Sequence, residues 1–311
     1  MSWKKLGQVF DPQVTKKDWY QDTFLTPTPF LKDADTIRVY GGLRDAAGAS
    51  RIGYVDVAAS DPTKVLKVSD KPVLDLGQDG MFDDNGVILG DVVRAPDGTV
   101  RMYYVGFQLP KKAKFLAFSG VAISHDNGDT FERCQETPIL DRAPNGRFIR
   151  AIHSVLFEDG LWKVWFSAGN GWQHIDGRDY PQYNIWYTTS KDGLTFDQPE
   201  HFCLDVAEGE YRIGRPRVRR IAKGYEMRFT YDTLSKDYRT GTAFSVDGIN
   251  WQRNDNQTGI TPGPEAWDAQ TLCYPAIINV NGKDYMFYNG NNMGQTGFGV
   301  AVATSNKEEA A

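Results

Sequence analysis

A short cassette that recurs five times constrains the fold of this chain more than any other feature. In each copy an alternating strand, a short loop and a second strand lead to a serine, after which Asp or Asn opens a turn. The serines are Ser60, Ser124, Ser190, Ser245 and Ser305, at intervals of 64, 66, 55 and 60 residues. Repeats of this length in a β-rich chain indicate a ring or an array of similar sheets.

The turns of the three central copies have a clear local chemistry. They occupy residues 124–131, 190–196 and 245–251, and each combines Ser, Asp, Gly and a final aromatic residue. Asp can bond its own backbone two residues further on, Gly accepts positive φ, and the aromatic residue packs back onto the sheet. We therefore interpret these acidic residues as structural and not catalytic, and we expect His125 to face solvent.

The segments before the turns alternate with a period of two and are rich in Tyr, Phe, Trp and Val, which is typical of strands. They are residues 37–40, 100–104, 162–166, 225–229 and 284–288. The last copy leaves too few residues for its final strand, which residues 3–10 can supply. The sequence thus predicts an all-β fold: a five-bladed β-propeller, one domain over residues 1–311, whose ring is closed when the N-terminal strand completes the last blade.

Composition limits the partners. The formal net charge is −5, and no run of Lys and Arg is long enough to follow a nucleic-acid backbone. The start lacks the apolar run of a signal peptide, and no stretch approaches the ~20 apolar residues of a membrane span. Cys134, Cys203 and Cys273 form no metal pattern and are interpreted as reduced core residues. We expect a cytoplasmic protein without cofactor, metal, nucleic-acid or membrane partner; the oligomeric state stays open.

Nearly the whole chain resembles the five-bladed propellers of glycoside hydrolase families 32, 43 and 130 and their uncharacterised relatives. The resemblance lies in the Ser-x-Asp-Gly turns and in four further segments: 71–74 (KPVL), 137–140 (TPIL), 288–291 (YNGN) and 296–299 (TGFG). It implies that the innermost strand of each blade points its first residues into a pocket on the axis. A fold alone does not determine a reaction, so the residues offered there must be weighed singly.

The resemblance implies a set of axial candidates, one or more from each blade: Asp22; Asp83 and Asp84; Arg150 and His153; Glu210, Arg212, Arg215 and Arg217; and Asp268. Glycoside cleavage needs two carboxyl groups that flank the bond. Hydrolases of family 43 place an Asp on the first blade, a tuning Asp on the second and a Glu acid on the third. Asp84 fits the second of these places and Asp22 is a candidate for the first, but Arg150 and His153 stand where the Glu is expected.

The arginines that replace the missing acid suggest an anionic substrate, because Arg forks bind phosphate or carboxylate oxygens in pairs. We predict a carbohydrate-active enzyme that cleaves or transfers a glycosidic or glycosyl-phosphate bond of an anionic, phosphorylated or nucleotide-activated sugar. Phosphate as the attacking group, in the manner of family 130, is one version of this reaction. Asp84 with Glu210 or Asp268 is the expected acid/base pair and His153 a further catalytic candidate. Outward salt bridges are the open alternative for the arginines.

Other residues are candidates for sugar contacts. Asp22, Asp83, Arg150 and Arg215 would bind the substrate, and Trp172, His174, Asn289 and Asn291 could stack on or donate to it, with structural turns as the alternative for these last four.

Two other functions stay open. A non-catalytic carbohydrate-binding propeller is favoured by the absent third-blade Glu. A sialidase-like hydrolase is suggested by the longer turn at residues 124–131 and by the many arginines, although such enzymes usually need six blades.

Overall fold

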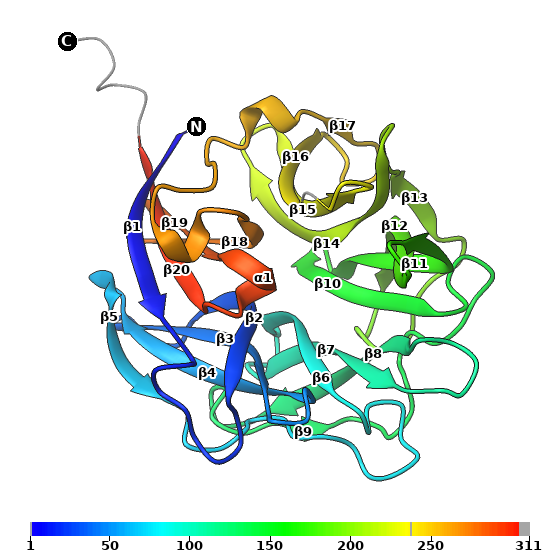
Figure 1. The fold of residues 1–311 in the computed structure, drawn as a ribbon, viewed down its shortest axis with the longest axis horizontal. Helices are drawn as coiled ribbons and strands as arrows, with labels where there is room; N and C mark the ends of the chain where they lie inside the picture. The colour runs from blue at the N-terminus through cyan, green and yellow to red at the C-terminus, as the bar shows by residue number, and fades with distance from the viewer. Residues whose placement is uncertain (1, 237, 305–311) are drawn as a thin grey trace.

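The computed structural model describes residues 2–236 and 238–304, and the strands in these ranges form five groups that surround a common centre (Figure 1). The first group contains β2 (Asp22–Leu31), β3 (Thr36–Arg44), β4 (Ser50–Ala58) and β5 (Asp61–Val68). The second contains β6 (Val87–Arg94), β7 (Val100–Gln108), β8 (Leu116–Ser124) and β9 (Glu132–Arg133). The third contains β10 (Ile149–Glu158), β11 (Leu161–Ile175), β12 (Arg178–Ser190) and β13 (His201–Leu204).

The fourth group contains β14 (Glu210–Ile221), β15 (Gly224–Thr233), β16 (Arg239–Ser245) and β17 (Gln252–Arg253). The fifth contains β18 (Cys273–Val280), β19 (Lys283–Asn289), β20 (Phe298–Thr304) and the first strand of the chain, β1 (Ser2–Phe10). Helical structure in the described residues is limited to η1 (Asp255–Gln257), η2 (Ala266–Asp268) and α1 (Asn291–Gly294). The prediction of an all-β fold is confirmed. None of these helices is long and apolar enough to cross a membrane.

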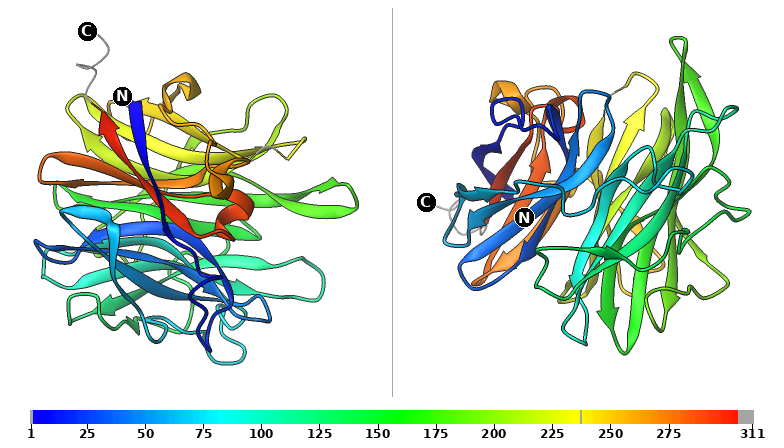
Figure 2. Two further views of the ribbon diagram at one scale, coloured as in Figure 1. Left: turned by 60° about the vertical axis from the view of Figure 1, so that its left-hand side comes forward. Right: turned by 90° about the horizontal axis from the view of Figure 1, so that it is seen from below.

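Two pairings link segments that are distant in sequence. β1 runs antiparallel to β20, from Ser2 opposite Thr304 to Phe10 opposite Phe298. The second and third groups share one sheet because β10 pairs in parallel with β8 at Ile149 and Arg150. β11 and β12 are the longest strands, and their hairpin extends past its neighbours (Figure 2).

The segments predicted to be strands lie in β3, β7, β11, β15 and β19, the second strand of each group. Large side chains of the strands fill the core between neighbouring groups. Phe24 of β2 and Phe298 of β20, for example, are fully buried with ring centres 4.7 Å apart, which joins the first group to the fifth. Burial of such aromatic rings is the main source of stability in a sheet protein of this kind.

The serine turns act as structural elements. Ser190 Oγ donates to Asp192 Oδ1 at 2.9 Å, and the Asp192 carboxylate accepts the backbone N–H groups of Thr195 and Leu194. The Thr195 N–H bond contributes most to lowering the pKa of Asp192 to about 2. The His125 side chain is exposed, as expected, and Ser305 lies outside the described residues.

A repeated hydrogen bond connects each turn to the preceding group. Tyr40 Oη donates to the carbonyl of Gly128 at 2.6 Å, Tyr103 Oη donates to that of Gly193 at 3.1 Å, and Trp165 Nε1 donates to that of Gly248 at 2.8 Å. In each case a buried aromatic residue of a second strand reaches the turn of the next group. The repeated cassette therefore forms both the turns and the hydrogen bonds between neighbouring groups.

The cysteines differ in their placement. All three are free, as predicted, but only Cys273 is buried. The prediction that all are core residues is wrong for Cys134, which is exposed because it follows the two-residue outer strand β9.

Candidate axial binding site

Each innermost strand has a β-bulge that shapes the centre of the molecule, and β2 and β14 have a second bulge, at Thr23 and Tyr211. The register of pairing skips Thr26 and Pro27 in β2, Gly90 in β6, His153 in β10, Arg215 and Pro216 in β14, and Tyr274 and Pro275 in β18. A bulge re-aims side chains and tolerates proline, which cannot donate to a ladder. The bulges thus turn one position of every innermost strand out of the regular alternation.

Three of the central bulges hold a non-glycine residue in the left-handed region. Thr26, Arg215 and Tyr274 have φ of 55°, 56° and 54°, and each precedes a proline. Such conformations cost about 1–3 kcal/mol each and persist only where the surrounding structure imposes them. Two of these residues, Arg215 and Tyr274, line the cavity described next.

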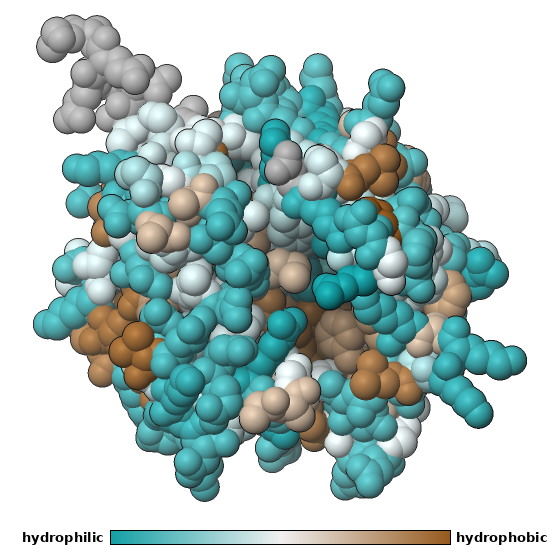
Figure 3. All heavy atoms as spheres, in the orientation of Figure 1, coloured by the Kyte–Doolittle hydropathy of each residue, from teal (hydrophilic) through white to brown (hydrophobic). Residues whose placement is uncertain are grey.

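A cavity of about 790 Å³ opens at the centre of one face, where Figure 3 shows the surface hollowed. Leu25 of β2, Ile88 of β6, His153 of β10, Arg215 of β14 and Tyr274 of β18 all line it. Because every group contributes its innermost strand, the cavity lies on the axis of the molecule. Its volume falls within the range of about 300–1,000 Å³ typical of small-molecule sites.

The cavity combines apolar walls with a few polar groups. The apolar part is contributed by Leu25, Ile88, Ile149 and Ala151 of innermost strands and by Val105 of β7 and Ala117 of β8. Phe107, Phe115, Tyr180, Tyr183 and Tyr238 add aromatic surface. Ring faces and C–H groups of a sugar pack well on such surfaces, and the polar groups then select its orientation.

Positive charge predominates in the cavity. Its basic residues are Arg44, Lys114, Arg212 and Arg215, and its acidic residues are Asp45 and Asp84. Arg212 is paired with Asp232 at 2.7 Å, and Asp45 is paired with Arg51 at 2.5 Å.

When these paired residues are left out of the count, the cavity has more cations than anions. Within the described residues, Arg44, Lys114 and Arg215 make no ion pair, and neither does Asp84. Three uncompensated cations therefore face a single uncompensated carboxylate. A cavity with this balance attracts anions.

Arg215 is the most constrained of these cations. Its guanidinium lies 5.2 Å from the centre of the Tyr274 ring, and its Nη1 is buried without a hydrogen-bond partner in the described part of the chain. An unsatisfied buried donor costs about 1–3 kcal/mol, more when it is charged. A ligand anion would satisfy it.

Tyr274 is itself fixed in place. Its hydroxyl accepts a hydrogen bond from Tyr238 Oη at 3.0 Å, and burial raises the pKa of Tyr274 to about 12. Both phenols therefore stay neutral, and the Tyr274 ring contacts Arg215 without cancelling its charge.

His153 occupies the bulge of β10 and is buried at the cavity wall. Burial, together with the nearby charges of Arg215 and Arg217, lowers the pKa of His153 well below its ordinary value. The imidazole is neutral near pH 7, so one ring nitrogen donates and the other accepts. It can hydrogen-bond an anion without a charge of its own.

Asp84 faces the cavity from the loop that precedes β6. Its Oδ2 accepts the backbone N–H of Gly80 at 3.0 Å, and its Oδ1 is buried with no partner among the described residues. The adjacent Asp83 does not line the cavity: it is fully buried and paired with Arg133 at 2.8 Å. Asp83 thus anchors the loop from which Asp84 reaches the site.

Arg217 lies beyond the bulges and does not line the axial cavity. Its Nη1 is 2.7 Å from Asp91 Oδ1, and its Nη2 contacts Thr28 Oγ1. It borders a separate cavity of about 210 Å³, together with Ser154 and Arg228. Arg217 is therefore held in a salt bridge, as Arg212 is, but its partners lie on other innermost strands and the pair does not point outward. Arg215, two residues earlier, makes no ion pair in the described residues.

Two predicted acids are engaged elsewhere. Glu210 is paired with Arg253 at 2.6 Å, and a bulge at Tyr211 separates it from the cavity residue Arg212. Asp268 is fully buried, paired with Lys5 at 2.6 Å and bonded by Tyr288 Oη at 3.2 Å. Neither carboxylate lines the axial cavity, so Asp84 meets neither of its expected partners there.

Arg150 and Asp22 also lie outside the cavity lining. Arg150 is ion-paired with Glu200 and donates to the carbonyl of Asp141 at 2.6 Å, which fixes it between neighbouring segments of the backbone. Asp22, the first residue of β2, accepts the hydroxyl of Thr23 at 2.8 Å. The position that β2 presents to the cavity is Leu25.

The remaining candidates are structural in their contacts. Trp172 packs its ring against the cavity residue Phe115 with centres 5.0 Å apart. His174 is exposed and paired with Asp179 at 2.8 Å. Asn289 accepts the N–H of Thr26 at 2.9 Å and donates to two carbonyls, and Asn291 bridges residues 266 and 270–271.

Several cavity residues were not predicted from sequence: Arg44, Asp45, Lys114, Tyr180, Tyr183 and Tyr238. Most of them lie in or next to loops, where no periodicity signals direction. For the inner strands, the sequence does contain a pattern that indicates the bulges. The same X-Pro pair occurs at three equivalent bulges, as Thr26-Pro27, Arg215-Pro216 and Tyr274-Pro275.

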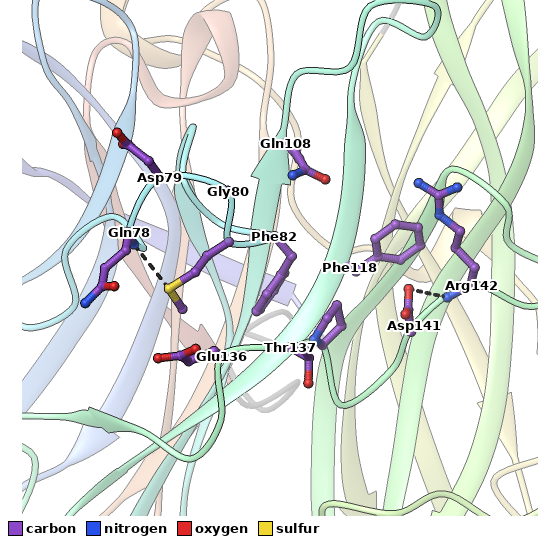
Figure 4. Close-up of a pocket in the computed structure, with 12 residues that line it drawn as sticks. Gln78, Asp79, Gly80, Phe82, Gln108, Phe118, Glu136, Thr137, Asp141 and Arg142 are labelled. Atoms are coloured by element: carbon purple, nitrogen blue, oxygen red, sulfur yellow. Dashed lines mark hydrogen bonds between the residues drawn. The ribbon is translucent and has the colours of Figure 1, made fainter.

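A second hollow, of about 550 Å³, lies next to the loop that precedes β6 (Figure 4). It is bordered by the loop carrying Asp79 and Phe82 and by the segment from Glu136 to Arg142, with Phe118 between them. Asp79, Glu136 and Asp141 outnumber its one basic residue, Arg142. Only the second group and the segment after it contribute, so this hollow lacks the convergence of five strands.

Comparison with solved structures identifies the fold. No protein-family model matches the sequence. A structure described as a glycoside hydrolase aligns with 97% of this chain and 92% of its own, with a TM-score of 0.75 and 18% identity. Another, described for the GH130 family of mannoside phosphorylases that contains hydrolases of β-1,2-mannosidic linkages in Candida mannan, aligns over 98% and 94%, with a TM-score of 0.72 and 16% identity. The chain has the fold of the β-propeller superfamily that includes glycoside hydrolase families 32 and 130.

Comparison with curated proteins then identifies the family. The uncharacterized protein Rv1502 of Mycobacterium tuberculosis is 33% identical over 303 residues, which cover 97% of this chain and 99% of the relative. The chain belongs to the family of this mycobacterial protein.

Proposed function

We propose that this protein is a carbohydrate-active enzyme that binds an anionic or phosphorylated sugar in the axial cavity and transfers its glycosyl group to or from phosphate. One observation carries the proposal: Arg44, Lys114 and Arg215 face the cavity without ion pairs in the described residues, opposite the single unpaired carboxylate of Asp84. Guanidinium and ammonium groups in this state bind phosphate oxygens.

The carboxylate count favours phosphorolysis over hydrolysis. A glycosidase uses two carboxyl groups, one as acid and one as base or nucleophile. In the axial cavity Asp45 is occupied by Arg51, which leaves Asp84. When phosphate is itself the nucleophile, one protein acid is sufficient.

The proposed reaction uses these groups as follows. Arg215, with neutral His153 beside it, holds inorganic phosphate. A phosphate oxygen bonds to the anomeric carbon while the glycosidic C–O bond breaks, and the carboxylic acid of Asp84 gives its proton to the departing oxygen. The products are a glycosyl phosphate and the shortened sugar; the reverse reaction uses Asp84 as the base.

The fold is compatible with this chemistry. One of the solved structures that shares it is described for a family of mannoside phosphorylases. We also propose that the five groups of strands are the blades of a five-bladed propeller, closed by β1 against β20 and forming one domain over residues 1–311. A cytoplasmic location and the lack of a cofactor or a nucleic-acid partner are proposed with it.

A non-catalytic carbohydrate-binding propeller is the second candidate. It is favoured by Leu25, because β2 contributes this aliphatic side chain to the cavity and no carboxylate. A sialidase-like hydrolase is disfavoured, because the described residues contain five groups of strands and such enzymes usually have six.

The test is a phosphate-dependent activity screen. Oligosaccharides are incubated with the protein and inorganic phosphate, and phosphorus NMR detects any glycosyl phosphate; glycosyl phosphates with acceptor sugars test the reverse direction. Asp84→Asn and Arg215→Met should abolish turnover. Asp79→Asn, in the same loop but at the second hollow, and Arg220→Met, on the exposed end of β14, are matched controls that should retain it. Saturable sugar binding without turnover would favour the binding propeller, and neither binding nor turnover would overturn the proposal.

A further inference from the structure

We propose that the mouth of the axial cavity holds a second anion site, formed by Lys114 and Lys236 around Tyr180. Building on the proposed function, this inference narrows the ligand to a sugar with two separate anionic groups, one bound deep at Arg215 and one at the mouth. Sugar bisphosphates and nucleotide-activated sugars have this chemistry.

Three different segments converge at this site. Tyr180 lies in β12 and lines the cavity. Lys236 comes from the loop between β15 and β16; its Nζ donates to the Tyr180 hydroxyl and lies 3.7 Å from the ring centre. Lys114 comes from the loop between β7 and β8, and its Nζ lies 5.4 Å from the same ring centre. The second, third and fourth groups thus each supply one residue.

The two ammonium groups are not neutralised by neighbouring acids. Lys114 Nζ donates to the carbonyl of Asp179 at 2.8 Å, while the carboxylate of Asp179 is paired with His174. Within the described ranges neither lysine makes an ion pair. An ammonium has three donors, and each lysine spends one of them on the contact given above. The others are available to a ligand.

The pKa of Tyr180 reflects the positive charge around it. Its hydrogen bond from Lys236, followed by the charges of Lys236 and Arg178, lowers the pKa of Tyr180. Its ring gives both cations an aromatic face to rest on, which holds them near each other without removing charge. The ammonium groups of Lys114 and Lys236 both lie beside this ring and repel each other. An anion bound between them would be attracted by both.

The mouth and the deep site belong to one cavity. Lys114 and Tyr180 line the same space as Arg215 and His153. At about 790 Å³ this space is larger than one phosphate group requires. Phe107 and Phe115, with ring centres 5.3 Å apart, provide aromatic surface within it for a ring or base.

The experiment uses probes that are independent of sugar identity. Calorimetric titration of the full chain compares methylphosphonate, which can fill one site, with alkane-α,ω-bisphosphonates of increasing length. Two linked anions gain from effective concentration, by about 10²–10⁴ when the linker matches the span. We expect at least one length to bind ten or more times more tightly than methylphosphonate.

Variants assign the two ends. The double variant Lys114→Gln/Lys236→Gln should abolish the gain of the bisphosphonates over methylphosphonate, and Lys236→Gln alone should reduce that gain, whereas Arg215→Met should weaken the binding of both probes. Lys236→Arg should keep the gain, and Lys223→Gln, an exposed lysine in the β14–β15 turn, is the matched control.

The two proposals fail in different ways. If methylphosphonate binding depends on Arg215 but no bisphosphonate binds more tightly, or if the lysine variants keep the full gain, the mouth site is overturned and the deep site stands. If no probe depends on Arg215, the proposed function falls together with this inference.

Discussion

The guanidinium of Arg215 lies 5.2 Å from the centre of the Tyr274 ring, although the two residues come from innermost strands of different groups. Each sits in a bulge, in the left-handed region, immediately before a proline. The face of the Tyr274 ring holds the Arg215 guanidinium at the cavity wall and does not neutralise its charge. Arg215 is thus positioned by its neighbours without being neutralised by them.

Tyr274→Leu should weaken the binding of phosphate-type ligands about fivefold, because a cation–π contact of about 1 kcal/mol that orients Arg215 is lost. Tyr274→Phe keeps the ring and should keep the affinity. Its cost falls on stability instead, about 1 kcal/mol, since Tyr238 loses its acceptor at 3.0 Å. Calorimetric titration with inorganic phosphate and urea denaturation separate the two effects. Equal affinity for both variants would contradict this role of the ring.

Asp268→Asn should lower the free energy of unfolding by about 1–3 kcal/mol, because it weakens the hydrogen bonds that the fully buried carboxylate accepts from half-buried Lys5 and from Tyr288. In contrast, Asp84→Asn should abolish turnover with little change in stability, since Asp84 has no cationic partner in the described residues. Urea denaturation and the phosphate-dependent assay should be run on both. A stable but inactive Asp268→Asn variant would restore Asp268 as a catalytic residue.

Acid should destabilise the turns. The pKa of Asp192 is lowered from its ordinary 3.8 to about 2 by bonds that exist only in the folded turn, the Thr195 N–H bond first. The folded state thus favours the ionised form, so this stability is present above about pH 4 and is lost as the pH falls toward about 2. Unfolding free energy measured across this window should decline, and Asp192→Asn should make the decline shallower. An unchanged slope would show that the turn does not contribute.

The hydrogen bonds between groups should be worth about 1 kcal/mol each. Tyr40→Phe removes the donor to Gly128 at 2.6 Å while it keeps the packed ring, so the cost reports the bond. Tyr103→Phe should behave alike at Gly193, and the double variant should be additive because the two sites share no partner. Urea denaturation of the four proteins completes the cycle, and a loss near zero would make these contacts incidental.

The sequence predicts the architecture better than the site. The all-β fold, the second strand of every group and the hydrogen-bonded roles of the turn residues follow from period-two alternation and the Ser-Asp-Gly chemistry, which are local. The inner strands do not obey such a rule. Each contains a bulge, so simple counting from the start of a strand assigns Glu210 to the cavity when Arg212 and Arg215 are the residues that reach it.

Partners that are distant in sequence account for the other differences. Asp268 is ion-paired with Lys5, Arg150 with Glu200 and Asp83 with Arg133. No local sequence pattern predicts these pairs. Lys114 reaches the cavity from a loop, and Tyr180 from the extended end of β12, so their positions depend on the packing of whole groups. The cationic character of the pocket was nonetheless predictable, because Arg215 alone among the inner-strand candidates combined a basic head with the X-Pro pattern of a bulge.

The pairing of β1 with β20 sets an order on biosynthesis. A ribosome releases the amino-terminal strand first and its partner last, so β1 has an unsatisfied edge while some 290 later residues are being made. The first four groups, built from contiguous stretches, can form as they emerge. The final sheet cannot form in this way, and a nascent chain halted before β20 would leave β1 without its pairing partner.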